Sequence, residues 1–320
     1  TGADTYTWSP ATSLNQTTGA TVTSTPAANI TYTVTGTNAA TGCVNTATTN
    51  ITINPLPIVT VNPNSGFICP GQSVNLTANG AATYTWTPNS GLSNTTGATV
   101  TANPASTTTY TVVGTSAAGC MDSTTVVVTV GAYANVDIMI TPTEGCEPLT
   151  VNFINNTTGA ASYQWNFGDG SAMSSDTSPT HIYNAGTWYP SVTITSTTGC
   201  VTVINPLDTI LVHPLPVADF TSNPDFGVTT ILEEANYEFT NTSSGADFYQ
   251  WIFGDGTGDT TTDATHTYTE AGNYDVTLIA TTIYGCADTI TRTPIIIIDE
   301  PSLWIPNAFT PNGDGINDFF

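Results

Sequence analysis

A tryptophan that recurs at near-constant spacing, each time followed by a cysteine, is the feature that most constrains this chain. The tryptophans that share a preceding Tyr-x pair are Trp8, Trp86, Trp165 and Trp251. The cysteines that follow them by 34 or 35 residues are Cys43, Cys120, Cys200 and Cys286. Successive tryptophans lie 78 to 86 residues apart, which is the size of a small independent domain. We therefore expect several homologous small domains rather than one large one.

The residues between these markers favour strands. Segments such as residues 30–34 (Ile-Thr-Tyr-Thr-Val) alternate with period two. Thr, Val, Ile and Tyr prefer strands, and the Gly and Pro between them mark turns. The chain is therefore predicted to be all-β, a string of small β-sandwiches in an extended arrangement.

Two Pro-Leu-Pro segments mark the boundaries between copies. They end at Pro57 and Pro216 and have the stiffness of polyproline linkers. The predicted divisions are residues 1–57, 58–131, 132–216, 217–300 and an unfinished segment 301–320.

The first copy opens directly on its Tyr6-Thr-Trp8 segment, whereas the others have about 25 to 30 residues of strand-like sequence before it. We expect residues 1–57 to lack their opening strands. Either the sequence is truncated there, or a neighbouring chain donates the strand as in β-augmentation.

The charge balance excludes several classes of function. The formal net charge is −23, and Arg292 is the single basic residue apart from histidine. Binding to nucleic acid or to an anionic membrane surface requires a basic footprint, which this chain lacks. Only Asp4 and Asp122 of the 24 acidic residues precede residue 132, so the first part has a Thr/Ser/Asn surface.

The six cysteines favour structural disulfides in an oxidising, extracytoplasmic setting, because they recur at regular positions without a Cys-x-x-Cys motif. We predict the pairs Cys69–Cys120 and Cys146–Cys200, each joining a first strand to a late hairpin of its own copy. Cys43 and Cys286 are predicted to be unpaired. Cys286 is either a buried leftover of a lost disulfide, or a free thiol that bridges to another molecule.

The third and fourth copies resemble PKD domains, which are seven-stranded Ig-like β-sandwiches of extracellular proteins. The segments that carry the resemblance are Tyr163–Gly170 (Tyr-Gln-Trp-Asn-Phe-Gly-Asp-Gly), Pro179–Tyr183, Ala185-Gly186 and Val192–Ile194, with Tyr249–Gly256, His266–Tyr268, Ala271-Gly272 and Val276–Leu278 in the fourth copy. The first two copies lack Phe-Gly-Asp-Gly and are predicted to be Ig-like relatives. The expected fold is thus a series of tandem Ig-like/PKD sandwiches.

Residues 306–318 (Pro-Asn-Ala-Phe-Thr-Pro-Asn-Gly-Asp-Gly-Ile-Asn-Asp) resemble the opening of the gliding-motility-associated C-terminal domain of Bacteroidota. That domain is a sorting signal for type 9 secretion. The resemblance implies export across the outer membrane and display at the cell surface, with the type 9 machinery as a partner. It also implies that the sorting domain continues after Phe320.

The Phe-Gly-Asp-Gly turn carries the most plausible chemistry in the chain, yet a structural role fits it better. Asp169 and Asp255 are isolated turn residues, whereas glycoside hydrolysis needs two carboxylates across one cleft. His181 and His266 lack a second ligand at metal spacing and are predicted to be structural. Alternating aromatics such as Trp165 suit a sandwich core; a glycan-stacking platform would need them to point outward.

The tail also has the oxygen-rich composition of a short calcium loop. Asn312, Asp314, Asn317 and Asp318 are candidate Ca²⁺ ligands, although a turn held by Asx hydrogen bonds is the alternative. Weaker candidates at a domain junction are Asp219, Asp225, Glu233 and Glu234. No other cofactor is predicted.

The resemblance to Bacteroidota proteins suggests O-glycosylation where Asp precedes Ser or Thr, at Ser123, Thr209, Thr260 and Thr289. The Asn-x-Ser/Thr sequons are expected by chance in so Thr- and Asn-rich a chain. Residues 295–298 (four Ile) are predicted to form a last strand with two side chains on each face, the outer pair available for docking or buried within the domain.

These observations predict a structural or adhesive stalk, or a filament-forming region, of a secreted cell-surface protein without catalysis. One alternative is the accessory region of a secreted hydrolase whose catalytic domain lies upstream. Another is a subunit of an extracellular polymer assembled by strand exchange. The expected partners are other copies of the chain or cell-surface proteins and polysaccharides.

Overall fold

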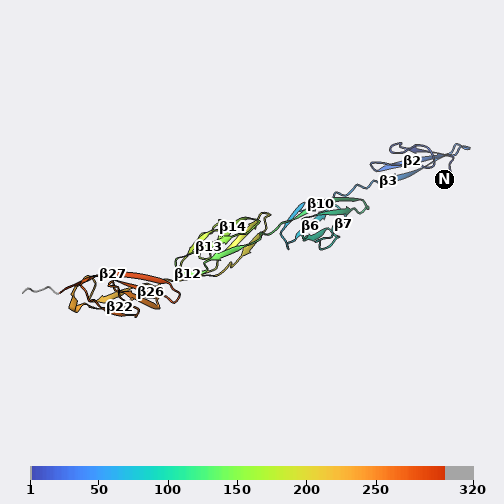
Figure 1. The fold of residues 1–320 in the computed structure, drawn as a ribbon. Coiled ribbons are helices and arrows are strands. Elements are labelled where there is room, and N and C mark those ends of the chain that lie inside the picture. The colour runs from blue at the N-terminus through green and yellow to red at the C-terminus, as the bar shows by residue number, and fades with distance from the viewer. Residues whose placement is uncertain (1, 300–320) are drawn as a thin grey trace, which may run out of the picture. The chain divides into compact units, whose positions relative to one another are not determined.

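The computed structural model describes residues 2–299, and these residues form 27 strands and one short 3-10 helix (Figure 1). The predicted all-β class is confirmed. For reference, residues 2–57, 58–131, 132–216 and 217–299 are called modules 1 to 4. The described part of the chain contains no helix with the length and hydropathy needed to cross a bilayer.

The chain divides into two compact units. Among the described residues, the first contains residues 2–133 together with Thr198–Cys200, and the second contains residues 134–197 and 201–299. The three-residue segment of module 3 that belongs to the first unit includes Cys200.

Module 2 is a complete two-sheet sandwich. One sheet has the order β4-β6-β8 and the other the order β5-β10-β9-β7. The strands are β4 (Thr60–Asn62), β5 (Ser65–Ile68), β6 (Val74–Asn79), β7 (Thr83–Thr87), β8 (Thr99–Ala102), β9 (Thr108–Thr115) and β10 (Met121–Val130). All pairs are antiparallel except β5 with β10, which run parallel.

Module 3 has the same plan with its second layer divided into two short sheets. The orders are β11-β13-β15, β14-β17-β18 and β12-β19-β16. The strands are β11 (Ile138–Thr141), β12 (Glu144–Cys146), β13 (Leu149–Asn155), β14 (Ala160–Asn166), β15 (Thr180–Tyr183), β16 (Gly186–Trp188), β17 (Ser191–Ser196), β18 (Val201–Ile204) and β19 (Ile210–His213). Here β12 runs parallel to β19.

Module 4 pairs a three-stranded sheet, β20-β22-β25, with a five-stranded one, β21-β27-β26-β23-β24. The elements are β20 (Phe220–Asn223), β21 (Thr229–Ile231), η1 (Leu232–Glu234), β22 (Asn236–Asn241), β23 (Phe248–Ile252), β24 (Gly258–Asp259), β25 (Ala264–Thr267), β26 (Gly272–Thr281) and β27 (Ala287–Ile298). Again the short first strand β21 runs parallel to the last strand β27.

Module 1 has a single three-stranded sheet, β1-β2-β3, with β1 (Thr5–Ser9), β2 (Ile30–Thr37) and β3 (Val44–Ile51). Within residues 2–57 no second sheet lies opposite it. The expectation that this copy lacks its opening strands stays a prediction.

The repeated tryptophan is the centre of each complete module. Trp86, Trp165 and Trp251 are at most 1% exposed and belong to three separate hydrophobic clusters, one in each of modules 2 to 4. A buried indole N–H needs an acceptor. Each one donates to a main-chain oxygen 10 or 11 residues later: Gly97 at 3.0 Å, Asp176 at 2.8 Å and Thr261 at 2.9 Å.

The core positions of the aromatic run are confirmed by burial. Phe167 and Phe253 are nearly as buried as the tryptophans, whereas Tyr163 is only partly buried and packs at the edge of its cluster. In β27 the predicted alternation also holds, since Ile295 and Ile297 are buried while Ile298 is 42% exposed.

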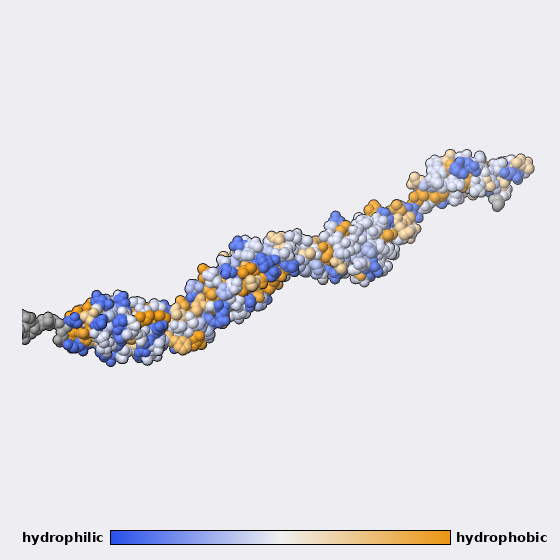
Figure 2. Space-filling view, in the orientation of Figure 1, coloured by the Kyte–Doolittle hydropathy of each residue, from blue (hydrophilic) through white to orange (hydrophobic). Residues whose placement is uncertain are grey.

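Surface polarity differs between the modules. In Figure 2 most of the visible surface of module 2 is pale, the colour of Thr and Ser, while module 4 shows more blue. This follows the sequence, because 22 of the 24 acidic residues come after residue 131.

The tail ligands proposed for calcium and the sorting-domain segment lie outside the described residues.

Candidate functional site: intermodule disulfides and aspartate–histidine turns

Two disulfides join neighbouring modules. Cys69 of module 2 is bonded to Cys200 of module 3, with Cα atoms 5.7 Å apart. Cys146 of module 3 is bonded to Cys286 of module 4, with Cα atoms 5.5 Å apart. The predicted pairs within single modules are therefore wrong, and so is the prediction that Cys286 is unpaired.

The direction of the first strand explains why Cys69 cannot reach Cys120. Cys69 follows Ile68, which is paired with Val130 at the last residue of β10. Cys120 directly precedes β10, a strand of 10 residues. At about 3.3 Å per residue the two cysteines lie roughly 30 Å apart, whereas a disulfide needs Cα atoms within about 7 Å.

The same argument applies to module 3. Cys146 is paired with His213 at the end of β19, while Cys200 directly precedes β18 at the start of the last-strand region. In both modules the first-strand cysteine thus lies beside the C-terminal end of the module's last strand. The hairpin cysteine of the next module is its partner. Cys43 and Cys120 are free cysteines.

Gly131 lies close to the first disulfide, where a larger residue would not fit. A Cβ atom added at Gly131 would lie 2.8 Å from Cys200 Sγ and 2.9 Å from Phe67 Cζ. The next residue, Ala132, both donates its N–H to Thr198 Oγ1 and accepts the Thr198 hydroxyl, each at 2.8 Å. Backbone, hydroxyl and sulfur contacts therefore surround the first disulfide.

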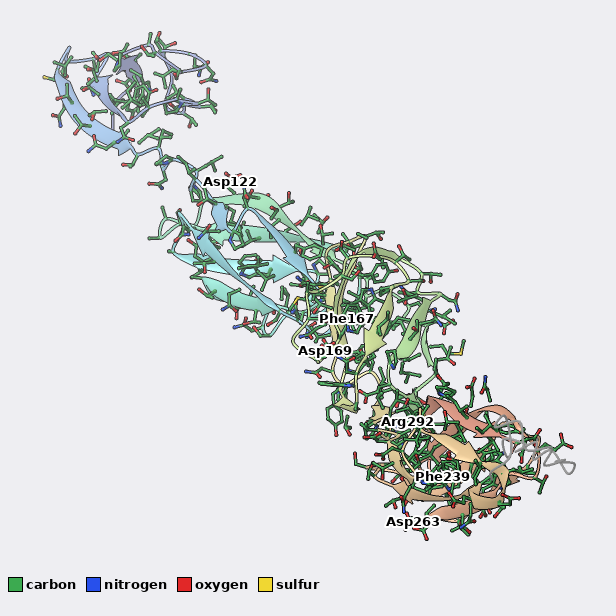
Figure 3. The ribbon with its side chains drawn as sticks, turned by 90° about the vertical axis from the view of Figure 1, so that its left-hand side faces the viewer. Asp122, Phe167, Asp169, Phe239, Asp263 and Arg292 are labelled. Atoms are coloured by element: carbon green, nitrogen blue, oxygen red, sulfur yellow. A yellow bond between two sulfur atoms is a disulfide. The ribbon has the colours of Figure 1, made fainter. Side chains whose placement is uncertain are left out.

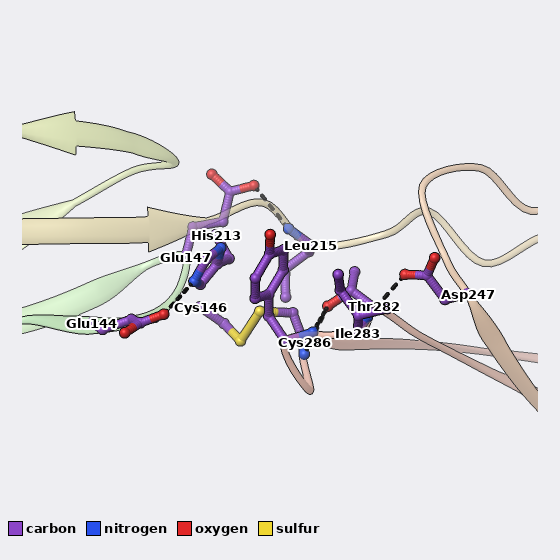
Figure 4. The surroundings of a disulfide bond; sticks show 10 residues. Glu144, Cys146, Glu147, His213, Leu215, Asp247, Thr282, Ile283 and Cys286 are labelled. Atoms are coloured by element: carbon purple, nitrogen blue, oxygen red, sulfur yellow. Dashed lines mark hydrogen bonds and ion pairs between the residues drawn. A yellow bond between two sulfur atoms is a disulfide. The ribbon is translucent and has the colours of Figure 1, made fainter.

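The second junction has a charged and aromatic environment (Figure 4). The His213 ring stacks on Tyr284 with centroids 3.7 Å apart, and His213 Nε2 lies 2.8 Å from Glu144 Oε1. Glu147 accepts the backbone N–H groups of Leu215 at 3.2 Å and of Ala185 at 2.9 Å. The disulfide and the His213–Tyr284 stacking thus hold the hairpin turn that carries Cys286 against the end of module 3, and the Glu144 and Glu147 contacts order that end.

The Phe-Gly-Asp-Gly turn of module 3 is closed by a histidine. Asp169 Oδ2 lies 2.6 Å from His181 Nε2, and Asp169 Oδ1 accepts the Ser171 N–H at 3.0 Å and its hydroxyl at 2.5 Å. Figure 3 labels Asp169 and Phe167 of this turn. The imidazole also stacks on Phe167 with centroids 4.0 Å apart and an interplanar angle of 2°.

Module 4 repeats this arrangement. His266 Nε2 lies 2.7 Å from Asp255 Oδ2, and its ring stacks on Phe253 with centroids 4.2 Å apart. Thr257 replaces Ser171 as the residue that donates to the aspartate, at 2.6 Å from its hydroxyl and 2.9 Å from its N–H. The two turns are therefore one structural motif.

The hydrogen bonds stabilise the ionised aspartate. Burial alone would raise the pKa of Asp169, but hydrogen bonds from Ser171 and His181 outweigh burial and lower this pKa to about 2. Hydrogen bonds from Thr257 and His266 likewise outweigh burial and lower the pKa of Asp255. Burial raises the pKa of Tyr183, whose hydroxyl donates to Phe167 O at 2.9 Å.

The motif does not have the geometry of a catalytic triad. In such a triad the carboxylate binds one ring nitrogen and the nucleophile lies at the other. Here Asp169 and the Ser171 hydroxyl, the latter at 3.4 Å, both approach His181 Nε2. The arrangement fixes a turn against the core, which is the structural role expected for His181 and Asp169.

A sequence profile of the PKD domain matches residues 133–212 and 215–296, together just over half of the chain. The chain belongs to the PKD-domain family. The matched segments are modules 3 and 4, the two PKD modules with the Asp–His turn. No curated protein matches the chain in sequence.

Solved structures similar to this PKD chain come from several sources. The PKD1 domain of the Vibrio cholerae metalloprotease PrtV is 32% identical, with 26% of this chain and 98% of that chain covered and a TM-score of 0.22. A calcium-stabilised ice-binding adhesin of an Antarctic bacterium is 15% identical over 93% and 90% of the two chains, with a TM-score of 0.33. The I67–I69 fragment of titin is 14% identical over 77% and 100%, with a TM-score of 0.44.

The weaker calcium candidates of the second PKD module are not gathered into one site. Asp219 Oδ1 binds Arg292 Nη2 at 2.5 Å and also accepts the Phe220 N–H. Among residues 2–299 no group of three or more His, Cys, Asp or Glu side chains is arranged to hold a metal ion. The junction sites formed from Asp219, Asp225, Glu233 and Glu234 therefore stay a prediction without a grouped ligand set.

The predicted O-glycosylation residues are all exposed: Ser123, Thr209, Thr260 and Thr289. In the three Asp-Thr cases the aspartate Oδ1 accepts the N–H of the following threonine, at 2.6 to 2.9 Å. Exposure is necessary for modification, and glycosylation of these residues stays a prediction.

Sequence reasoning missed two features of this site. It did not pair the aspartates with the histidines, although the recurrence of Asp and His at separations of 12 and 11 residues was a signal. It also did not pair the first-strand cysteine of one module with the hairpin cysteine of the next module. The unmatched Cys286 was the signal there, because it has a partner once the pairing runs to the preceding module.

Proposed function

We propose that the chain is a load-bearing structural or adhesive region of a secreted cell-surface protein. The observation that supports this is the pair of disulfides that link one module to the next. A bond within a module stabilises that module alone. A bond between modules makes a series of domains resist being pulled apart.

The two disulfides overlap in sequence, because Cys146 lies before Cys200 and Cys286 lies after it. The shortest covalent path from Cys69 to Cys286 passes through both bonds and only the roughly 50 residues between Cys146 and Cys200. Under tension, the modules cannot be drawn out beyond that path while the bonds remain intact. This limit on extension suits a stalk that holds a cell-surface contact.

An extracellular location is part of the proposal. Disulfides persist in oxidising compartments, and the hydroxyl-rich surface carries exposed sites suited to glycosylation. The tail, which resembles a type 9 sorting domain of Bacteroidota, would direct export through that machinery. The partners we propose are cell-surface proteins, polysaccharides or further copies of the chain.

Single-molecule force spectroscopy on the full chain tests the load-bearing role. We expect reduction of the two disulfides to lengthen the fully extended path by roughly 160 residues, or about 550 Å at about 3.5 Å per residue. The control is the chain with Cys69→Ser and Cys146→Ser, which should extend fully without reductant. Equal extension before and after reduction would contradict the proposal.

Location and assembly need a separate measurement. Labelling of intact cells with an antibody to modules 3 and 4 should detect the protein at the surface, and negative-stain microscopy should show beaded particles. A globular head on a stalk would instead favour the accessory region of a hydrolase, and ordered filaments would favour a polymer subunit.

A further inference from the structure

Modules 2, 3 and 4 share a strand arrangement that the two disulfides connect from module to module. In each of them a short early strand runs parallel to the last strand: β5 with β10, β12 with β19 and β21 with β27. The bonded cysteines Cys69 and Cys146 lie at the end of such an early strand, and Cys200 and Cys286 directly precede β18 and β27. Each disulfide therefore joins the end of a first strand to the beginning of the last-strand region of the next module.

These connections create two covalent paths of strands. The first path follows β4 and β5 of module 2, crosses the Cys69–Cys200 bond, follows β18 and β19 of module 3, and enters β20 and β21 of module 4 through residues 214–216. The second path follows β10 of module 2, continues into β11 and β12 of module 3, crosses the Cys146–Cys286 bond and follows β27 of module 4. In each of the three modules, one path supplies the first strand and the other path supplies the last strand.

The two paths are hydrogen-bonded to each other once in every linked module, through the parallel strand pair. Main-chain bonds between the paths, each 2.9 Å long, join Gly131 N–H to Ile68 O in module 2, Leu211 N–H to Thr143 O in module 3 and Gly227 N–H to Pro294 O in module 4. The three strand pairs are therefore equivalent connections between the same two paths.

Tension along the chain loads these three strand pairs together. The pull from the N-terminal side enters the first path at β4, and the pull from the C-terminal side enters the second path at the end of β27. In each pair, one strand is therefore pulled at its beginning and its parallel neighbour is pulled at its end. Such a pull slides the two strands along their axes, so the evenly spaced hydrogen bonds of a parallel pair resist at the same time.

The opening of one linked module cannot lengthen the chain by itself. If module 3 alone unfolded, the strand pairs of modules 2 and 4 would still hold the two paths at the same relative position. The paths separate only after the pairs in all three modules have broken. In a series of unlinked modules, by contrast, every strand pair carries the full tension and the weakest module opens first.

We propose that the two disulfides couple modules 2, 3 and 4 into one mechanical unit, which yields only when all three parallel strand pairs break together. This inference rests on the load-bearing role proposed above and adds how the load is divided. The disulfides not only limit the final extension but also determine the force at which extension begins.

Each disulfide alone protects a different pair of modules. Without Cys146–Cys286, the C-terminal pull reaches the first path only through β21 and β27, so module 4 carries the whole load. Without Cys69–Cys200, the N-terminal pull reaches the second path only through β5 and β10, so module 2 carries it. The remaining bond keeps the other two modules out of the load.

Single-molecule force spectroscopy on the full chain tests this inference through the force at which modules 2 to 4 open. The oxidised wild type should show one combined event at up to about three times the force of a single module, because forced unfolding depends on the rate of rupture and three pairs divide the load. Cys69→Ser with Cys200→Ser, and Cys146→Ser with Cys286→Ser, should each show one event at the lower force. Replacing all four cysteines by serine should give three separate events.

Cys120→Ser is the matched control, because Cys120 is free and lies outside both bonds. This substitution should leave the force of the combined event unchanged. A wild type that opens module by module, or at the force of a single module, would overturn the inference even if its total extension stays limited. A total extension that does not depend on the disulfides would overturn the load-bearing role and this inference with it. The number of events in the unaltered chain decides the matter even if a variant folds poorly.

Discussion

Modules 2 and 3 solve the same packing problem with different turns. Both bury a tryptophan whose indole N–H bonds to the main chain 11 residues later. Module 3 then closes its turn with the Asp169–His181 pair stacked on Phe167, whereas the strand of module 2 runs from Trp86 into Thr87-Pro88. The tryptophan framework is therefore sufficient for the sandwich, and the Asp–His turn is an addition in the PKD modules.

The largest expected effect comes from replacing the buried tryptophan that both modules share. Trp86→Ala and Trp165→Ala should each destabilise their own module by about 3 to 5 kcal/mol, the usual cost of deleting a buried large aromatic. Hydrogen exchange of the full chain, followed by mass spectrometry on peptic peptides, resolves the modules. Trp8→Ala is the matched control, and its cost should be clearly smaller because Trp8 is only partly buried. Unequal costs for Trp86 and Trp165 would mean that the frameworks are not equivalent.

The ends of the two modules provide the next comparison. Module 2 ends in Gly131 against Cys200, whereas β19 of module 3 is followed by Pro214. Gly131→Ala should lower the stability of the first junction by about 1 to 3 kcal/mol, because the methyl group overlaps the sulfur and the Phe67 ring.

Equilibrium denaturation of the oxidised chain measures the cost of Gly131→Ala. The control is the same substitution in a Cys69→Ser, Cys200→Ser background, where the cost should fall. An unchanged cost in that background would show that the disulfide does not require the glycine.

Lowering the pH should reduce the stability of module 3 more than that of module 2, because only module 3 has the Asp169 turn. Its folded pKa is about 2, below the ordinary value of 3.8, so its stabilising contribution is complete above about pH 4 and is lost as the pH falls toward 2. Allowing for solvent screening, the contribution is about 1 to 2 kcal/mol. Denaturation of the wild type and of Asp169→Asn should differ by this amount at pH 6 and converge near pH 2. A difference that is constant with pH would exclude the ionised carboxylate as the cause.

The smallest effect is expected at the more exposed carboxylate–histidine pair, Glu144 with His213. Glu144 is 62% exposed where it contacts His213, whereas Asp169 is 16% exposed beside His181. Glu144→Gln should therefore change stability by less than about 0.5 kcal/mol. Glu144→Asp is the control for side-chain length. A loss as large as that from Asp169→Asn would show that burial is not what distinguishes the two pairs.

Much of the fold could be predicted because it depends on local patterns. Alternation of Thr with Val, Ile and Tyr predicted the strands, and the spacing of Trp86, Trp165 and Trp251 predicted separate cores. The aromatic run that contains Phe167 was correctly assigned to the core, since period two places alternate side chains on one face.

The candidate site was harder to predict because its contacts are not local. Asp169 and His181 meet only when the turn after β14 folds against β15, and the spacing of 12 residues in sequence does not reveal that contact. The cysteines have the same difficulty on a larger scale, with partners separated by 131 and 140 residues.

The sequence by itself therefore determined the class, the number of repeats and the tryptophan at the centre of each core. Only the tertiary structure decided which cysteine meets which. The reason is the parallel pairing of the short first strand with the last strand of its module, which carries Cys69 to the end where module 2 finishes. From that end the hairpin of its own module is out of reach, and the hairpin of the next module supplies the bond.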